Sequence, residues 1–65
     1  MNIKHIREKY NISQQNLAEL LSVDRSTVAK WETGKALPTA DKLPKLAQIL
    51  KCNIDELFEH ENKTA

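Results

Sequence analysis

A polar stripe of residues lies between positions 25 and 33, at spacings that place its members on one side of a helix. Its members are basic or small and include no acid: Arg25, Ser26, Ala29, Lys30 and Thr33. An Arg side chain can pair with guanine O6 and N7, a Ser hydroxyl can bond several bases, and an Ala methyl group can touch a thymine methyl group. The chemistry open to this stripe is therefore contact with the edges of DNA bases.

Residues 14–34 must position the stripe, and they read as two short amphipathic helices joined by a tight turn. The apolar positions are Leu17, Ala18 and Leu21 on the first helix, and Val28 and Trp31 on the second. Ala18 is small enough to allow two steeply crossing helices to approach closely. This pattern is typical of a helix-turn-helix whose second helix can enter the major groove of DNA.

Length and composition narrow the possible classes of protein. A chain of 65 residues allows one small domain, and 40% hydrophobic with 29% charged residues is an ordinary globular composition. One Gly, two Pro and no β-branched or aromatic runs argue against strands. The apolar runs are too short for a signal peptide or a membrane span, and one cysteine cannot form an internal disulfide. We therefore expect a cytoplasmic protein that does not contact a membrane.

The distribution of charge is more informative than its total, which is only +1. Residues 1–35 hold six Lys or Arg against four acids, a net charge of +2. Residues 36–65 hold four Lys against five acids, a net charge of −1. Contact with DNA phosphates is therefore expected in the first half of the chain.

The apolar spacing predicts an all-α fold of five helices around one core, with no repeats and no low-complexity segment. The expected helices cover about 3–10, 14–21, 25–33, 39–50 and 54–59. We assign residues 1–60 to this domain and residues 61–65 to a frayed tail.

Residue types at the predicted boundaries support these helices. Ser13 and Asp24 are suited to N-caps, Asn53 with Glu56 forms a capping box, and Asn11 and Gly34 can adopt the left-handed conformation that ends a helix.

The start of the fourth helix is ambiguous because Pro44 lacks a backbone N–H. A cap at Thr39 would make Pro44 the fifth helical residue, whereas a cap at Asp41 would put it in the first turn. We favour an irregular first turn that begins near Thr39.

Taken together, the spacing resembles the phage-repressor-like helix-turn-helix family, of the Cro and lambda repressor type (XRE family). The matching residues are Gln14, Leu17-Ala18, Leu21, Val23, Val28 and Trp31-Glu32 followed by Gly34, and the likeness continues through LPTADKLPKLAQIL and NIDELF. It covers nearly the whole chain and implies a compact five-helix domain that binds operator DNA as a two-fold dimer. Ser22 departs from the family, which often has Gly at the turn. A left-handed non-Gly residue costs roughly 1–2 kcal/mol, so we expect lower stability but the same fold.

The resemblance assigns roles to residues on the two helices. It implies a base contact from Arg25 and a phosphate contact from Gln14. Side-chain chemistry and position add Ser26, Ala29 and Lys30 as candidate base contacts, and Thr27, Thr33 and Lys35 as candidate phosphate contacts. Gln14 follows the Ser13 cap, where free N–H groups and a partial positive charge favour a phosphate. The alternatives are phosphate contact for Arg25 or Lys30, and an ordinary solvated helix surface for each position.

Glu32 lies one turn after Val28, beside the core-facing positions, where a carboxylate needs a partner. Arg7 on the first helix is the candidate, and related repressors pair an Arg and a Glu at the matching positions. We interpret the two as a structural ion pair that locks the third helix against the first. Trp31 shares the helical face of Val28, which indicates core packing rather than base stacking.

The remaining reactive side chains do not indicate an enzyme, a metal site or a cofactor. Cys52 is expected to be a buried thiol that fills space. His5 and His60 lack partners at metal-ligand spacing. The chain also has no Gly-rich phosphate loop and no catalytic pair of nucleophile and base.

The leading interpretation is a sequence-specific regulator of transcription, a repressor, that binds a palindromic operator in double-stranded DNA as a homodimer. Leu57 and Phe58 are the candidate dimer interface. One alternative is an antitoxin-type autorepressor whose segment 54–61 binds a toxin or another protein antagonist. Another is a protein-interaction module that kept the fold without DNA binding. That module is expected to carry acids on the outward stripe, where this chain has Arg25 and Lys30.

Overall fold

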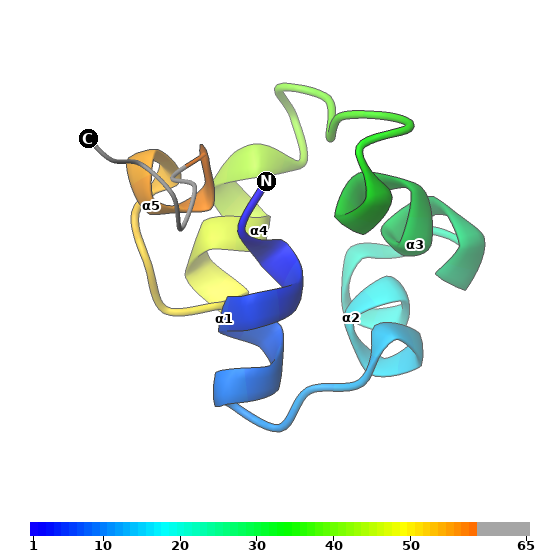
Figure 1. Ribbon diagram of the computed structural model, residues 1–65, viewed down its shortest axis with the longest axis horizontal. Helices are drawn as coiled ribbons and strands as arrows, with labels where there is room; N and C mark the ends of the chain where they lie inside the picture. Colours follow the sequence, from blue (N-terminus) through cyan, green and yellow to red (C-terminus); the bar gives the residue numbers. More distant parts are fainter. Residues whose placement is uncertain (59–65) are drawn as a thin grey trace.

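The computed structural model describes residues 1–58, which form five helices and no strand (Figure 1). The helices are α1 (Ile3–Lys9), α2 (Gln14–Leu21), α3 (Arg25–Thr33), α4 (Leu43–Ile49) and α5 (Ile54–Phe58). The predicted all-α, five-helix fold is thus confirmed. The predicted tail, residues 61–65, and the end of the domain at residue 60 lie outside the described residues. None of the described helices has the length and apolarity needed to cross a membrane.

One core joins all five helices. In Figure 1, α2 and α3 lie together on one side of α1, and α5 lies on the other side. The buried apolar residues are Ile3, Ile6, Leu17, Ala18, Leu21, Val28, Trp31, Leu46, Ala47, Leu50 and Leu57. Trp31 is among them, as its helical spacing predicted. Ala18 is fully buried on α2, and α2 packs against α3.

The ends of α2 explain why the helix-turn-helix is so tight. The Ser13 hydroxyl accepts a hydrogen bond from the Asn16 backbone N–H at 2.9 Å, as predicted for an N-cap. At the other end, Ser22 has a φ of 60°, in the left-handed region. The N–H of Val23 then donates to the Ala18 carbonyl at 2.9 Å. Because only three residues, Ser22, Val23 and Asp24, connect the two helices, α3 starts directly against α2.

The start of α3 agrees with the prediction except for one hydrogen bond, whereas the start of α4 needs correction. Asp24 occupies the N-cap position of α3, but its side chain makes no capping hydrogen bond. The regular part of α4 begins at Leu43, with Lys42 as N-cap, and Pro44 lies in its first turn where its missing N–H costs nothing. Residues 39–42 form a separate turn in which the Lys42 N–H donates to the Thr39 carbonyl at 2.9 Å.

The start of α5 agrees with the predicted capping box. The Asn53 side-chain oxygen accepts from the Glu56 N–H, and the Glu56 carboxylate accepts from the Asn53 N–H, each at 2.8 Å. The capping box fixes the residue at which α5 begins. Within this helix Leu57 is fully buried in the core, whereas Ile54 and Phe58 are 40% and 42% exposed.

Candidate nucleic-acid interface

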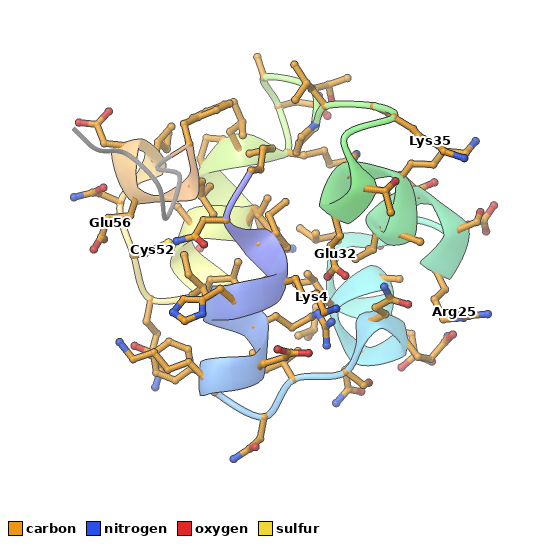
Figure 2. All side chains as sticks on the ribbon, viewed as in Figure 1. Lys4, Arg25, Glu32, Lys35, Cys52 and Glu56 are labelled. Carbon is orange, nitrogen blue, oxygen red and sulfur yellow. The ribbon has the colours of Figure 1, made fainter. Side chains whose placement is uncertain are left out.

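Helix α3 presents its polar stripe to solvent. Arg25, Ser26, Lys30 and Thr33 are exposed, and Thr27 and Ala29 are half-buried. The only acid within α3 is Glu32, and its carboxylate is turned away from the stripe toward α1 and α2. Figure 2 shows Arg25 and Lys35 projecting outward near opposite ends of α3. The outward surface of α3 is therefore basic or neutral along its length.

The ion pair between Arg7 and Glu32 lies behind that surface. Arg7 Nε donates to Glu32 Oε2 at 2.7 Å, and Nη2 donates to Oε1 at 3.3 Å. The two side chains are only 10% and 4% exposed. Arg7 Nη1 also donates to the Ile12 carbonyl at 2.7 Å, so the guanidinium is satisfied inside the protein. The structure thus brings the predicted pair together, and it draws α1 and α3 against the α1–α2 connection.

Gln14 connects this buried pair to the surface. Its amide nitrogen donates to Glu32 Oε1 at 2.9 Å, and its amide oxygen accepts from Arg25 Nη1 at 3.4 Å. These two contacts were not anticipated from the sequence. The available signal is positional: Gln14 and Arg25 are each the first residue of a helix, and a three-residue connection holds those helices together.

The start of α2 can still receive an anion. The first N–H groups of an α-helix have no partner within the helix, and they add a partial positive charge at that end. Gln14 is the first residue of α2 and has a second amide hydrogen besides the one given to Glu32. The predicted phosphate contact and the two side-chain contacts are therefore compatible.

The other predicted phosphate residues lie around the far part of α3. The Thr33 hydroxyl donates to the Lys30 carbonyl at 3.3 Å, so it is engaged with its own helix. Lys35 is exposed just beyond the left-handed Gly34 that ends α3. Thr27 is half-buried, at the side of α3. Lys30 and Lys35 are the exposed basic residues at this end.

The predicted dimer interface is only partly available. Leu57 is fully buried in the core, so it cannot contact a second protein chain without unfolding its surroundings. Phe58 remains exposed, and Ile54 one turn earlier lies on the same side of α5. The predicted interface is therefore reduced to Phe58, with Ile54 beside it.

Among residues 1–58, the reactive side chains outside α2 and α3 form no group of metal ligands. Cys52 is half-buried, so the predicted filling role holds in part, and burial raises the pKa of its thiol. It lines a shallow cavity with His5, Tyr10 and Glu56. Within residues 1–58, no three His, Cys, Asp or Glu side chains are grouped as metal ligands would be. His60 lies outside the described residues.

Comparison with known proteins shows how widely this arrangement is shared. The sequence pattern of a helix-turn-helix family (HTH_3) matches residues 3–57, which includes all of α1 to α4 and most of α5. The chain belongs to this helix-turn-helix family. The predicted resemblance to the XRE-type helix-turn-helix proteins is thereby confirmed.

Its relatives carry the names of transcriptional regulators. An HTH-type transcriptional activator, BcrR of Enterococcus faecalis, is 36% identical over 59 residues, covering 91% of this chain and 29% of the relative. The phage CTXphi transcriptional repressor RstR of Vibrio cholerae is 35% identical over 51 residues, which cover 78% of this chain and 46% of the repressor. An HTH-type transcriptional regulator of Methanocaldococcus jannaschii is 32% identical over 60 residues, which cover 92% of this chain and 91% of that regulator. The chain thus spans less than half of the first two relatives and nearly all of the third.

Proposed function

We propose that this helix-turn-helix domain is a sequence-specific regulator of transcription that inserts α3 into the major groove of double-stranded DNA. The observation that carries the proposal is the outward surface of α3, where Arg25, Ser26 and Lys30 are exposed and the single acid of the helix is turned inward. An exposed helix of this width fits the major groove, and its small residues allow close approach to base edges. The names of the relatives support the same function.

Within that function, base contacts come from Arg25, Ser26, Ala29 and Lys30. Arg25 is the leading residue because it projects from the N-terminal end of α3, where its guanidinium can reach guanine O6 and N7. Phosphate contacts come from residues on either side of the stripe, namely Gln14, Thr27, Thr33 and Lys35. Such contacts fix the position of the protein on the duplex but carry little sequence information.

The protein acts as a homodimer on a palindromic operator and represses by occupying it. Two-fold pairing places half-sites about one helical turn of DNA apart. The exposed apolar pair Ile54 and Phe58 is the candidate interface, since it belongs to α5, and α5 lies away from α2 and α3 in Figure 1. Repression is supported by the likeness to a phage repressor.

The decisive experiment is selection of bound sites from random DNA duplexes at two salt concentrations, with the parent protein and Arg25→Ala. A palindromic site that loses preference at one base pair in the variant would support a dimeric sequence reader. Binding that is salt-sensitive but enriches no site would show attraction to phosphates alone. No binding at low salt would overturn the proposal and favour a protein-interaction module.

A further inference from the structure

Four polar side chains from three helices form one continuous hydrogen-bonded chain. It runs from buried Arg7 on α1 to Glu32 on α3, then to Gln14 on α2, and ends at exposed Arg25 at the start of α3. The successive donor–acceptor distances are 2.7 Å, 2.9 Å and 3.4 Å. Figure 2 shows Glu32 turned inward and Arg25 projecting outward. This series of hydrogen bonds thus links the buried ion pair to Arg25, the leading residue of the proposed base contacts.

The chemistry of the four groups determines which of them donates and which accepts in each hydrogen bond of this series. A guanidinium can only donate hydrogen bonds, a carboxylate can only accept them, and an amide does both from opposite edges. Because Glu32 can only accept, the Gln14 edge that faces it must be the NH₂ group. The Gln14 carbonyl then has to face outward, where Arg25, which can only donate, finds an acceptor.

We propose that Glu32, held by Arg7, is a positioning residue for DNA reading: it orients the Gln14 amide so that the Gln14 carbonyl holds the Arg25 guanidinium ready for a base. This inference rests on the proposed function and deepens it. A free Arg side chain on an exposed helix start has many rotamers, and ordering it on binding costs affinity. A contact through Nη1 alone restricts the side chain but leaves most of its five N–H donors for a guanine.

Replacement of Glu32 by Gln would reverse the orientation of the Gln14 amide. The new amide must keep its oxygen toward Arg7, because Arg7 only donates. Its NH₂ group then faces Gln14, which has to turn its own carbonyl inward and its NH₂ group outward. Arg25 would meet a donor instead of an acceptor and lose its fixed position, although Gln14 could still donate to a phosphate.

The primary test is the variant Gln14→Ala, which removes the link but leaves the Arg7–Glu32 ion pair intact. Gln15→Ala is a matched control, because Gln15 is the neighbouring amide on α2, exposed, and bonded only to Glu19 at 3.0 Å. The measured quantity is discrimination: affinity for the selected duplex divided by affinity for the same duplex with the Arg25-dependent base pair replaced. A well-placed Arg–guanine pair contributes roughly 5- to 150-fold to such a ratio.

We expect Gln14→Ala to lower the discrimination at that base pair about fivefold or more, and Gln15→Ala to leave it within about twofold. In an Arg25→Ala background, Gln14→Ala should cause no further loss of discrimination, since the two residues act as a unit. Glu32→Gln should lower the same ratio, with circular dichroism used to verify that it folds. Thermal melting of each variant separates a loss of fold from a loss of reading.

Three results would overturn the proposal. If Gln14→Ala weakens binding to every duplex equally, Gln14 is a phosphate contact only. If the losses from Gln14→Ala and Arg25→Ala are additive, no positioning occurs. If the parent protein selects a site but Arg25→Ala changes no base preference, then Arg25 has no reading role to support. By contrast, a parent protein that binds no duplex selectively would refute the proposed function itself.

Discussion

The half of the molecule that carries α2 and α3 and the half that carries α4 and α5 share one core but are fixed by different interactions. On the α2–α3 side, the Arg7–Glu32 ion pair is nearly buried and is continued by directional hydrogen bonds to the surface. On the α4–α5 side, the interior is formed by Leu46, Leu50 and Leu57, each fully buried. Among residues 1–58 no second ion pair is present to fix α4 or α5.

The two kinds of interaction differ in how strictly they fix the orientation of the helices. Hydrogen bonds fix both distance and orientation, so the polar side can hold α3 and its exposed side chains in one geometry. Apolar contact is non-directional, so the other side supplies stability and sets orientation less strictly. The polar side is also the more vulnerable one, because removal of one partner leaves a buried charge without compensation.

The largest predicted effect comes from breaking the ion pair. Glu32→Ala would leave the Arg7 guanidinium buried and unpaired, and we expect it to lower the free energy of unfolding by about 3–5 kcal/mol. Small domains are stable by roughly 0.05–0.15 kcal/mol per residue, which is about 3–10 kcal/mol for a chain of 65 residues, so this loss is a large part of its stability. Urea unfolding followed by circular dichroism measures it.

Glu19→Ala is the control for that variant. Glu19 is exposed on α2 and only accepts a hydrogen bond from Gln15, so its removal should change the free energy of unfolding by less than about 0.5 kcal/mol. Equal midpoints for the two variants would contradict a locking role for the ion pair. Recovery in a double variant, Arg7→Met with Glu32→Leu, would show that the cost lies in the unpaired charge.

A somewhat smaller effect is expected on the apolar side. Leu57→Ala removes a fully buried side chain and should lower the free energy of unfolding by about 2–5 kcal/mol. Phe58 is 42% exposed, so Phe58→Ala should cost less than half of that in the unfolding of a single subunit.

Phe58→Ala should act on assembly instead. If α5 forms the dimer interface, the variant sediments as a monomer at concentrations where the parent protein is a dimer. An unchanged dimer, or a parent protein that is monomeric at every concentration tested, would rule out this interface. Ile54→Ala, one turn away, is expected to weaken the dimer in the same direction.

The sequence was sufficient to predict the helices and most of the core because both follow from spacing. Ile3 and Ile6, and then Val28 and Trp31, recur at helical intervals, and Ser13 and Asn53 mark helix starts by their residue type. The pairing of Arg7 with Glu32 followed from the resemblance and from the rule that a carboxylate near the core needs a partner.

The remaining details depend on rotation and direction, which spacing does not encode. Leu57 and Phe58 are neighbours of similar polarity, and the packing of α5 against the core decides that Leu57 is buried and Phe58 is exposed. Gln14 could have faced solvent, and its contacts arise because α2 and α3 bring its amide between a carboxylate and a guanidinium. The start of α4 was displaced because residues 39–42 prefer a turn.

A smaller effect on the free energy of unfolding is expected from substitutions at the left-handed residues that follow α2 and α4. Ser22 follows α2 with a φ of 60°, and Lys51 follows α4 with a φ of 57°. Ser22→Gly relieves a strain of roughly 1–2 kcal/mol but adds backbone entropy to the unfolded chain, so a net gain of about 0.5–1 kcal/mol is expected.

Lys51→Gly should gain less than Ser22→Gly. The Lys51 ammonium lies 5.7 Å from the centre of the Tyr10 ring, and an exposed cation–π contact contributes about 0.5–1 kcal/mol that the Gly variant loses. Comparison of the two melting temperatures is the measurement. A larger gain at Lys51 would show that its contact with Tyr10 adds no stability.

The smallest effect concerns Cys52, on the α4–α5 connection. Burial, and secondarily the charge of Glu56, raise the pKa of its thiol above the ordinary value. Since the folded state disfavours the thiolate, the associated stability is present below the pKa of the unfolded thiol, about 8.5, and is lost as the pH rises above it. The free energy of unfolding of the parent protein, minus that of Cys52→Ala, should therefore fall between about pH 8 and pH 10.

Alkylation of Cys52 should likewise be slower in the folded protein than in urea at pH 8, because the thiolate is the reacting form. Glu56→Gln removes the charge while its side-chain oxygen can still accept from the Asn53 N–H, so alkylation should be faster than in the parent protein with α5 still capped. An alkylation rate that is the same in the folded and unfolded protein would show that Cys52 is open to solvent. The α4–α5 connection would then be less firmly packed than the burial of the thiol indicates. The difference in rigidity between the α4–α5 side and the α2–α3 side would be correspondingly larger.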